Sequence, residues 1–187
     1  MTAALDVFLA DLRDAYGRLV YTHKTHEKMA EMKSWRLGAM KIINIVILAL
    51  TLSAVIADLL SEESDPWFSA VKVLSVSSAA IALIYAFVQL SFDPGGDAVR
   101  FRDSAKLFLA LRDAYGSLIV DGKSGADLDE LRVKRDELAK RKSEVEASSP
   151  QTTKRGYKKA CQALSGAESV TLTADDITRI FPAELRP

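Results

Sequence analysis

Polar side chains recur at regular spacing inside two otherwise apolar stretches of the sequence. Asn44, Thr51 and Asp58 are spaced by seven residues, so they lie on one stripe of a helix. Four more polar residues share one face of a second helix: Ser75, Ser78, Tyr85 and Gln89. Polar groups facing lipid are costly, so both stripes should face protein or water. Two interpretations stay open: the stripes bind the two helices together, or they line an aqueous path, which needs several copies of the chain.

Other motifs that could do chemistry are incomplete. Gly122-Lys123-Ser124 matches the end of a phosphate-binding loop, but the glycine required five residues earlier is replaced by Ser117. The segment also follows a helix rather than a strand, so we expect a plain turn. His23 and His26 are three residues apart, but no second set of metal ligands accompanies them. We therefore expect a solvated helix there, no metal site, no catalytic residues and no enzymatic activity.

A cluster of basic residues near the C-terminus is a candidate phosphate site. Its members are Lys154, Arg155, Lys158 and Lys159. They could hold the phosphates of a nucleotide, such as a cyclic oligonucleotide that acts as an activating ligand. The plainer interpretation is a solvated basic helix, and no other cofactor is indicated.

The polar stripes belong to two stretches long enough to cross a membrane. Residues 37–60 would form a helix of about 36 Å, and residues 67–92 are similarly apolar. The spans are joined by a short acidic link, so residues 37–92 are expected to form a transmembrane hairpin. Soluble core helices normally keep a polar face, whereas these two are apolar nearly all round.

Basic residues flank the hairpin and predict its orientation. Five precede the first span between Lys24 and Lys41, and four follow the second between Arg100 and Arg112. The link has no Lys or Arg before Lys72. The positive-inside rule therefore places both termini in the cytoplasm.

The remaining segments predict an all-α protein with a cytoplasmic helical bundle. Residues 1–36 form an amphipathic helix that continues into the first span, since no Gly or Pro interrupts it from 18 to 37. Residues 97–147 form a helical region in which Leu131, Leu138 and Val145 are spaced by sevens. Residues 148–187 form a tail with short helices, the last starting near Thr173.

The motif Leu-Arg-Asp-Ala-Tyr-Gly occurs twice, at residues 12–17 and 111–116. Two helices would thus present the same kind of contact surface: Leu12, Tyr16 and Gly17 in one, and Leu111, Tyr115 and Gly116 in the other. The repeat is either a pseudo-symmetric contact or a coincidence between similar amphipathic helices.

The composition limits the kinds of molecule that the protein is expected to bind and the covalent links that it can form. The 187 residues carry 25 basic and 25 acidic side chains, and this balance does not indicate nucleic-acid binding. The single cysteine, Cys161, excludes a disulfide within the chain.

The layout resembles the SLATT family, the SMODS- and SLOG-associating two-transmembrane effectors of bacteria. The resemblance rests on the order of "LRDAYGRLVYTHKTHEKMA", the two close spans, "LRDAYGSLIV", "SSPQTTKRGYKKACQAL" and "TADDITRIFPAELRP", which covers nearly the whole chain. It implies an inner-membrane effector of an anti-phage conflict system that oligomerises and breaches the membrane when activated. Its expected partners are the lipid bilayer, further copies of the chain, and a nucleotide synthase or SLOG-type sensor. The alternative is a non-conducting adaptor whose helical bundle docks a soluble partner or senses a nucleotide.

Overall fold

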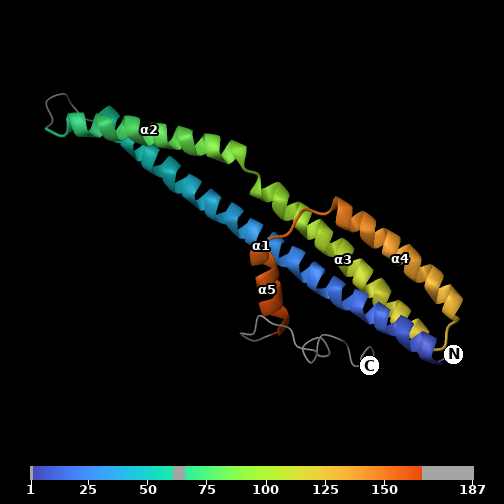
Figure 1. The fold of residues 1–187 in the computed structure, drawn as a ribbon. Coiled ribbons are helices and arrows are strands. Elements are labelled where there is room, and N and C mark those ends of the chain that lie inside the picture. The colour runs from blue at the N-terminus through green and yellow to red at the C-terminus, as the bar shows by residue number, and fades with distance from the viewer. Residues whose placement is uncertain (1, 61–65, 166–187) are drawn as a thin grey trace. The chain divides into compact units, whose positions relative to one another are not determined.

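The computed structural model describes residues 2–60 and 66–165, and these residues form five helices and no strand (Figure 1). The helices are α1 (Thr2–Leu60), α2 (Phe68–Ser91), α3 (Pro94–Lys123), α4 (Leu128–Ser148) and α5 (Lys154–Ser165). The prediction of an all-α fold is confirmed. The short helix expected near Thr173 lies outside the described residues.

α1 runs unbroken through the N-terminal segment and the first apolar stretch. The sequence predicts this continuity, because no proline or adjacent pair of glycines interrupts the helix. Gly17 and Gly38 are accommodated singly within it, at a cost of about 1 kcal/mol each relative to alanine.

The boundary between α2 and α3 differs from the expected one. The sequence predicts that Asp93-Pro94-Gly95-Gly96 breaks the chain, with helix resuming near residue 97, whereas α3 begins at Pro94. Proline is favoured in a first helical turn. The Asp93 carboxylate accepts a hydrogen bond from the Gly96 amide at 2.8 Å and thereby caps the helix. The break is thus confined to the two residues before Pro94.

The chain divides into two compact units. One unit comprises residues 1–32 and 98–187, and the other comprises residues 33–97. The first holds most of the buried side chains of the described residues, and the second is a helical hairpin.

The first unit is built around one hydrophobic cluster shared by α1, α3 and α4. Its fully buried members include Leu12, Leu19, Phe108, Ile119 and Leu131. Both copies of the repeated motif contribute to it, since Leu12, Tyr16, Leu111 and Tyr115 are all buried there. The glycines of the repeat differ, because Gly116 is buried whereas a Cβ at Gly17 would meet nothing within 4 Å.

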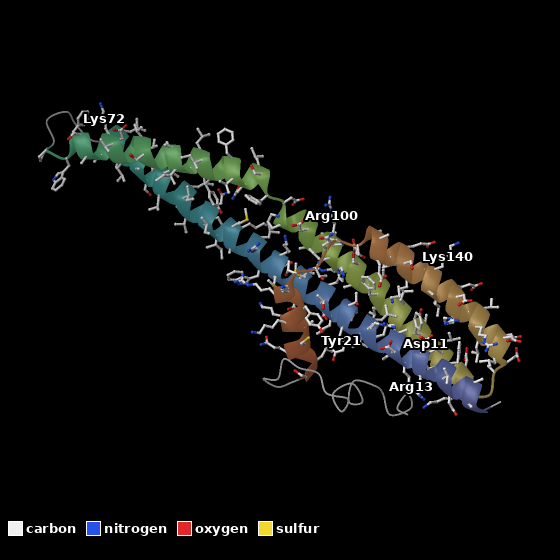
Figure 2. All side chains as sticks on the ribbon, viewed as in Figure 1. Asp11, Arg13, Tyr21, Lys72, Arg100 and Lys140 are labelled. Carbon is white, nitrogen blue, oxygen red and sulfur yellow. The ribbon has the colours of Figure 1, made fainter. Side chains whose placement is uncertain are left out.

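The helix α4 packs on this cluster through the residues spaced by sevens. Leu131 and Val145 are buried, and Leu138 is partly buried against the same cluster. At the periphery, Asp11 of α1, labelled in Figure 2, forms an ion pair with Arg135 of α4 at 3.2 Å. An exposed pair of this kind contributes about 0.2–1 kcal/mol, so apolar burial holds α4 in place.

Candidate functional site

The least exposed positions of the two apolar stretches form a seam within the hairpin. In α1 these least exposed positions recur every three or four residues, and most of the positions between them are exposed. The least exposed residues of α1 are Asn44, Ile47, Thr51, Ala54 and Asp58. The least exposed residues of α2 have the same spacing: Val71, Ser75, Ser78, Ala82, Tyr85 and Gln89. We call these two sets together the polar seam. All seven intramembrane polar residues singled out in the sequence lie in it.

Two polar contacts join α1 and α2 along the polar seam. The Thr51 hydroxyl lies 2.9 Å from the carbonyl oxygen of Ile47 in its own helix and 3.4 Å from that of Ser78 in the other. Nearer the end of the hairpin where α1 enters it, the Tyr85 hydroxyl donates to the carbonyl oxygen of Met40 at 2.9 Å. The Tyr85 hydrogen bond and the Thr51–Ser78 contact cross between antiparallel helices, so the polar seam is an interface inside the hairpin.

The register of the polar seam follows from the contact between Thr51 and Ser78. Moving three residues forward in α1 and three back in α2 brings Ala54 opposite Ser75. Both are buried, at 6% and 9% exposure. Small residues at this point allow the two backbones to approach closely, as in other membrane helix pairs.

The faces of the hairpin outside the polar seam are apolar and exposed. They carry large side chains that include Ile45, Leu52, Leu59, Val76, Ile84 and Phe87. Only 6% of the most apolar window of each helix is buried, and both helices are long and apolar enough to cross a membrane. A core helix of a soluble protein would be mostly buried, so this surface is suited to lipid.

Two serine hydroxyls on the exposed faces are bonded to their own helix. Ser53 donates to the carbonyl oxygen of Ala49 at 2.8 Å, and Ser91 donates to that of Phe87 at 3.1 Å. These bonds reduce the cost of placing hydroxyls in lipid. Among the uncharged polar side chains of the spans, Asn44, Thr51, Tyr85 and Gln89 lie in the polar seam.

Both histidines contact residues of α3. The Nδ1 atom of His23 lies 2.9 Å from the carbonyl oxygen of Ala105. His26 is 3% exposed, with ring centroids of Phe101 and Phe108 at 5.6 and 4.9 Å. The expectation of a solvated helix is therefore wrong at His26, because α3 covers this face of α1. Within residues 2–60 and 66–165, no three metal-ligating side chains gather.

Burial has an electrostatic consequence for His26. Desolvation lowers the pKa of His26 below its ordinary value, and the neighbouring His23 lowers it further. The imidazole is therefore held neutral near pH 7, as part of the aromatic packing between α1 and α3.

The segment at Gly122-Lys123-Ser124 ends α3 and enters a turn. Gly125 has a φ of 90°, a conformation that glycine adopts without strain. The Ser124 hydroxyl donates to the carbonyl oxygen of Val120 in the preceding helix turn. A hydrogen-bonded helix end of this kind does not form a phosphate cradle.

The basic cluster lies on the helix α5, and its side chains are exposed. Lys154, Arg155, Lys158 and Lys159 are all exposed, whereas Gly156, Ala160 and Cys161 are buried on the other side of the helix. A Cβ at Gly156 would lie 2.7 Å from Cγ of Met29 in α1, so glycine permits the close approach. The phosphate-binding role of the four cations stays a prediction.

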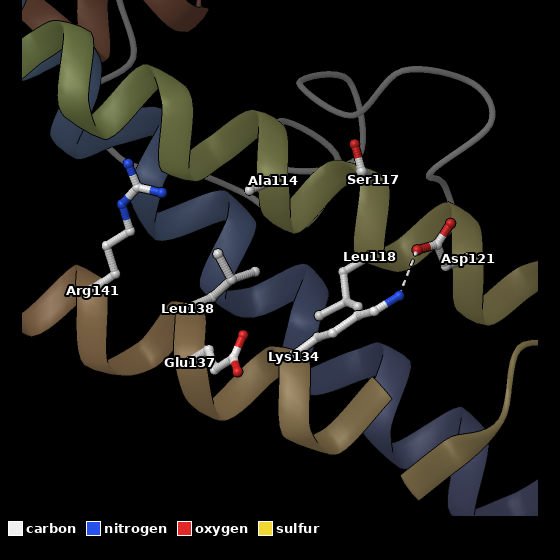
Figure 3. A pocket seen from close by; sticks show the side chains of 8 residues that line it. All are labelled: Ala114, Ser117, Leu118, Asp121, Lys134, Glu137, Leu138 and Arg141. Atoms are coloured by element: carbon white, nitrogen blue, oxygen red, sulfur yellow. Dashed lines mark ion pairs between the residues drawn. The ribbon is translucent and has the colours of Figure 1, made fainter. Parts of the chain in front are cut away.

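A groove between α3 and α4 carries charges of both signs (Figure 3). Its volume is about 480 Å³, and Asp121 and Lys134 form an ion pair across it at 3.8 Å. Glu137 and Arg141 add one further charge of each sign. No sequence motif indicates this groove, because it arises only where α4 folds back along α3. Its balanced charges favour neither anions nor cations.

Comparison with known proteins adds one match. A protein-family model described as "SMODS and SLOG-associating 2TM effector domain family 4" matches residues 8–176. This confirms the family resemblance predicted from the sequence. No curated protein and no solved structure matches the chain significantly.

Proposed function

We propose that this protein, which belongs to the SMODS and SLOG-associating two-transmembrane effector domain family 4, is a membrane effector that assembles into oligomers and makes the membrane permeable to ions. It would act in a conflict system in which a partner of the SMODS or SLOG class supplies the activating signal. The proposal rests on the polar seam, which places Asn44, Thr51 and Asp58 inside a two-span hairpin.

The polar seam suits a hairpin that is closed at rest. Thr51 contacts the Ser78 carbonyl oxygen, and Tyr85 bonds to the Met40 carbonyl oxygen. Two helices packed in this way enclose no water-filled path. A conducting state would require α1 and α2 to separate along the polar seam, so that its polar residues face water between several hairpins.

Such a rearrangement breaks only weak interactions in a membrane. Hydrogen bonds between membrane helices contribute about 0.6 kcal/mol each on average. Exchanging the few bonds of the polar seam for contacts with water or with another copy would therefore cost little. The apolar outer faces could keep their contact with lipid throughout.

Induced expression tests the proposal directly. We expect the membrane potential, followed with a potential-sensitive dye, to collapse when the protein is expressed together with its activating partner. The variant with Asn44→Leu and Thr51→Leu should insert in the membrane but leave the potential intact, because its seam cannot line a water-filled path. Insertion is checked by immunoblotting of the membrane fraction.

Two results would contradict this function. An intact potential with the wild-type protein in the membrane, with and without the partner, would exclude permeabilisation. If the leucine variant kept full biological activity while substitutions on the surface of α5 abolished it, the protein would be a non-conducting adaptor.

The proposed orientation, with both termini in the cytoplasm, is tested by labelling single cysteines in a Cys161→Ala background. Trp67 is 74% exposed before α2, and Ser148 is exposed at the end of α4. Trp67→Cys should react with an impermeant maleimide on intact cells, and Ser148→Cys only after the cells are opened. The expectation follows from the basic flanks of the hairpin. The opposite labelling pattern would refute it.

A further inference from the structure

A cavity of about 340 Å³ lies between α1 and α2 at the end of the hairpin where α1 enters it. We call it the neck pocket, and its principal lining residues are Lys33, Arg36, Met40, Ile43, Val88 and Phe92. All of them belong to the hairpin unit, residues 33–97. No sequence motif indicates the pocket, and the proposed permeabilisation does not use it.

The inner wall of the neck pocket is apolar and lies within the spans. Ile43, Val88 and Phe92 line it and are 47%, 43% and 65% exposed. Tyr85 also lines the pocket, and its hydroxyl bonds to the Met40 carbonyl oxygen and joins the two helices. In a membrane these exposed side chains would face hydrocarbon, so this part of the pocket opens towards acyl chains.

Two cations and two carboxylates line the mouth of the neck pocket, and three of these four groups are bonded to other residues of the described hairpin. Lys33 forms an ion pair with Asp97, and the Asp93 carboxylate caps α3 through the Gly96 amide. Arg36 lines the same mouth, is exposed, and forms no ion pair within the described part of the chain. A guanidinium can bind a phosphate through two parallel hydrogen bonds.

The combination of an arginine at the mouth and an apolar inner wall matches one class of molecule. We propose that the neck pocket binds an anionic phospholipid, with its phosphate on Arg36 and the start of an acyl chain against Ile43 and Val88. A free phosphate would leave the apolar wall exposed to water. Because Lys33 pairs with Asp97 and Asp93 is bonded to an amide of α3, Arg36 is the cation that is left for a phosphate. A headgroup with its own ammonium would bring a second cation to this guanidinium, which favours a lipid without one.

Native mass spectrometry of the full chain in detergent tests the assignment. The protein is stripped of lipid and then titrated with phosphatidylglycerol or phosphatidylcholine. The wild-type chain should bind one phosphatidylglycerol per chain, at least about ten-fold more tightly than phosphatidylcholine. Arg36→Gln should weaken phosphatidylglycerol binding about ten-fold, the effect expected for a lost charge-assisted hydrogen bond.

Ala39 also lines the pocket, which allows a variant that changes its volume without changing charge. Ala39→Leu should fill the space and displace the lipid even though Arg36 is retained. The matched control is Ala49→Leu, at an exposed position of the span outside the pocket. This variant should bind lipid as the wild type does.

Lys41→Gln removes one positive charge from the same end of the hairpin, at an exposed position outside the pocket lining. It should leave binding unchanged. If Lys41→Gln weakened binding as much as Arg36→Gln, the lipid would be held by diffuse surface charge and the proposed site would be wrong. Equal affinity for the two lipids, or displacement of the lipid by millimolar inorganic phosphate, would also overturn it.

Discussion

A disulfide between positions 54 and 75 should abolish the membrane depolarisation caused by the activated protein. Ala54 and Ser75 are both buried in the polar seam, and the register set by Thr51 and Ser78 brings them opposite each other. In a Cys161→Ala background, the double variant Ala54→Cys and Ser75→Cys would covalently close the hairpin on oxidation. If conduction requires the two helices to separate, the oxidised protein should give no more depolarisation than cells lacking it.

Because a disulfide can be reduced again, the closed and the released hairpin can be compared in the same cells. Reduction with a membrane-permeant thiol should restore depolarisation in the same cells. The control pair, Ser53→Cys with Val76→Cys, occupies exposed positions next to the seam residues. These side chains do not face each other, so oxidant should leave the control as active as the wild type. Full depolarisation by the cross-linked hairpin would refute opening along the polar seam.

The second large effect concerns the first unit, where Leu12→Ala and Leu111→Ala should each lower the free energy of unfolding by about 2–5 kcal/mol. The two leucines are 0% and 2% exposed in the shared hydrophobic cluster. Truncation removes favourable burial and leaves a cavity that well-packed neighbours close only partly. The change is measured by chemical denaturation of the full chain in detergent.

Leu107→Ala provides the matched control, because Leu107 lies in α3 as Leu111 does but is 43% exposed. It should lower the free energy of unfolding by less than about 1 kcal/mol. If Leu12→Ala cost no more than Leu107→Ala, the repeated motif would not form the core of this unit. A large loss at both leucines would show that both copies of the motif stabilise the unit.

Most of the secondary structure, and the two apolar helices of membrane-spanning length, can be predicted from the amino-acid sequence. Whether a stretch such as residues 37–60 can cross a membrane depends on its own length and polarity, and both are local properties. The continuity of α1 likewise follows from the lack of a local break. The period of seven that relates Asn44, Thr51 and Asp58 places them on one face of any helix, whatever surrounds it.

The neighbour that each of these helix faces contacts could be identified only in the folded structure. The sequence left open whether the stripe of α1 faces α2 or water, because a helical period gives a direction but not a neighbour. In the described hairpin, the Thr51 hydroxyl contacts a backbone oxygen of α2 and the Tyr85 hydroxyl bonds to one of α1, so the stripe faces α2 in this conformation. His26 shows the same limit, since its burial depends on Phe101 and Phe108, more than seventy positions away in the chain.

The neck pocket and the groove between α3 and α4 could not be predicted for the same reason. Each is a space between the side chains of two helices, as with Arg36 of α1 and Val88 of α2 or Ser117 of α3 and Arg141 of α4. Local propensity determines each helix, but the shape of the space between two helices depends on their register and approach. Those are fixed by close packing of particular side chains, which no periodicity in one segment encodes.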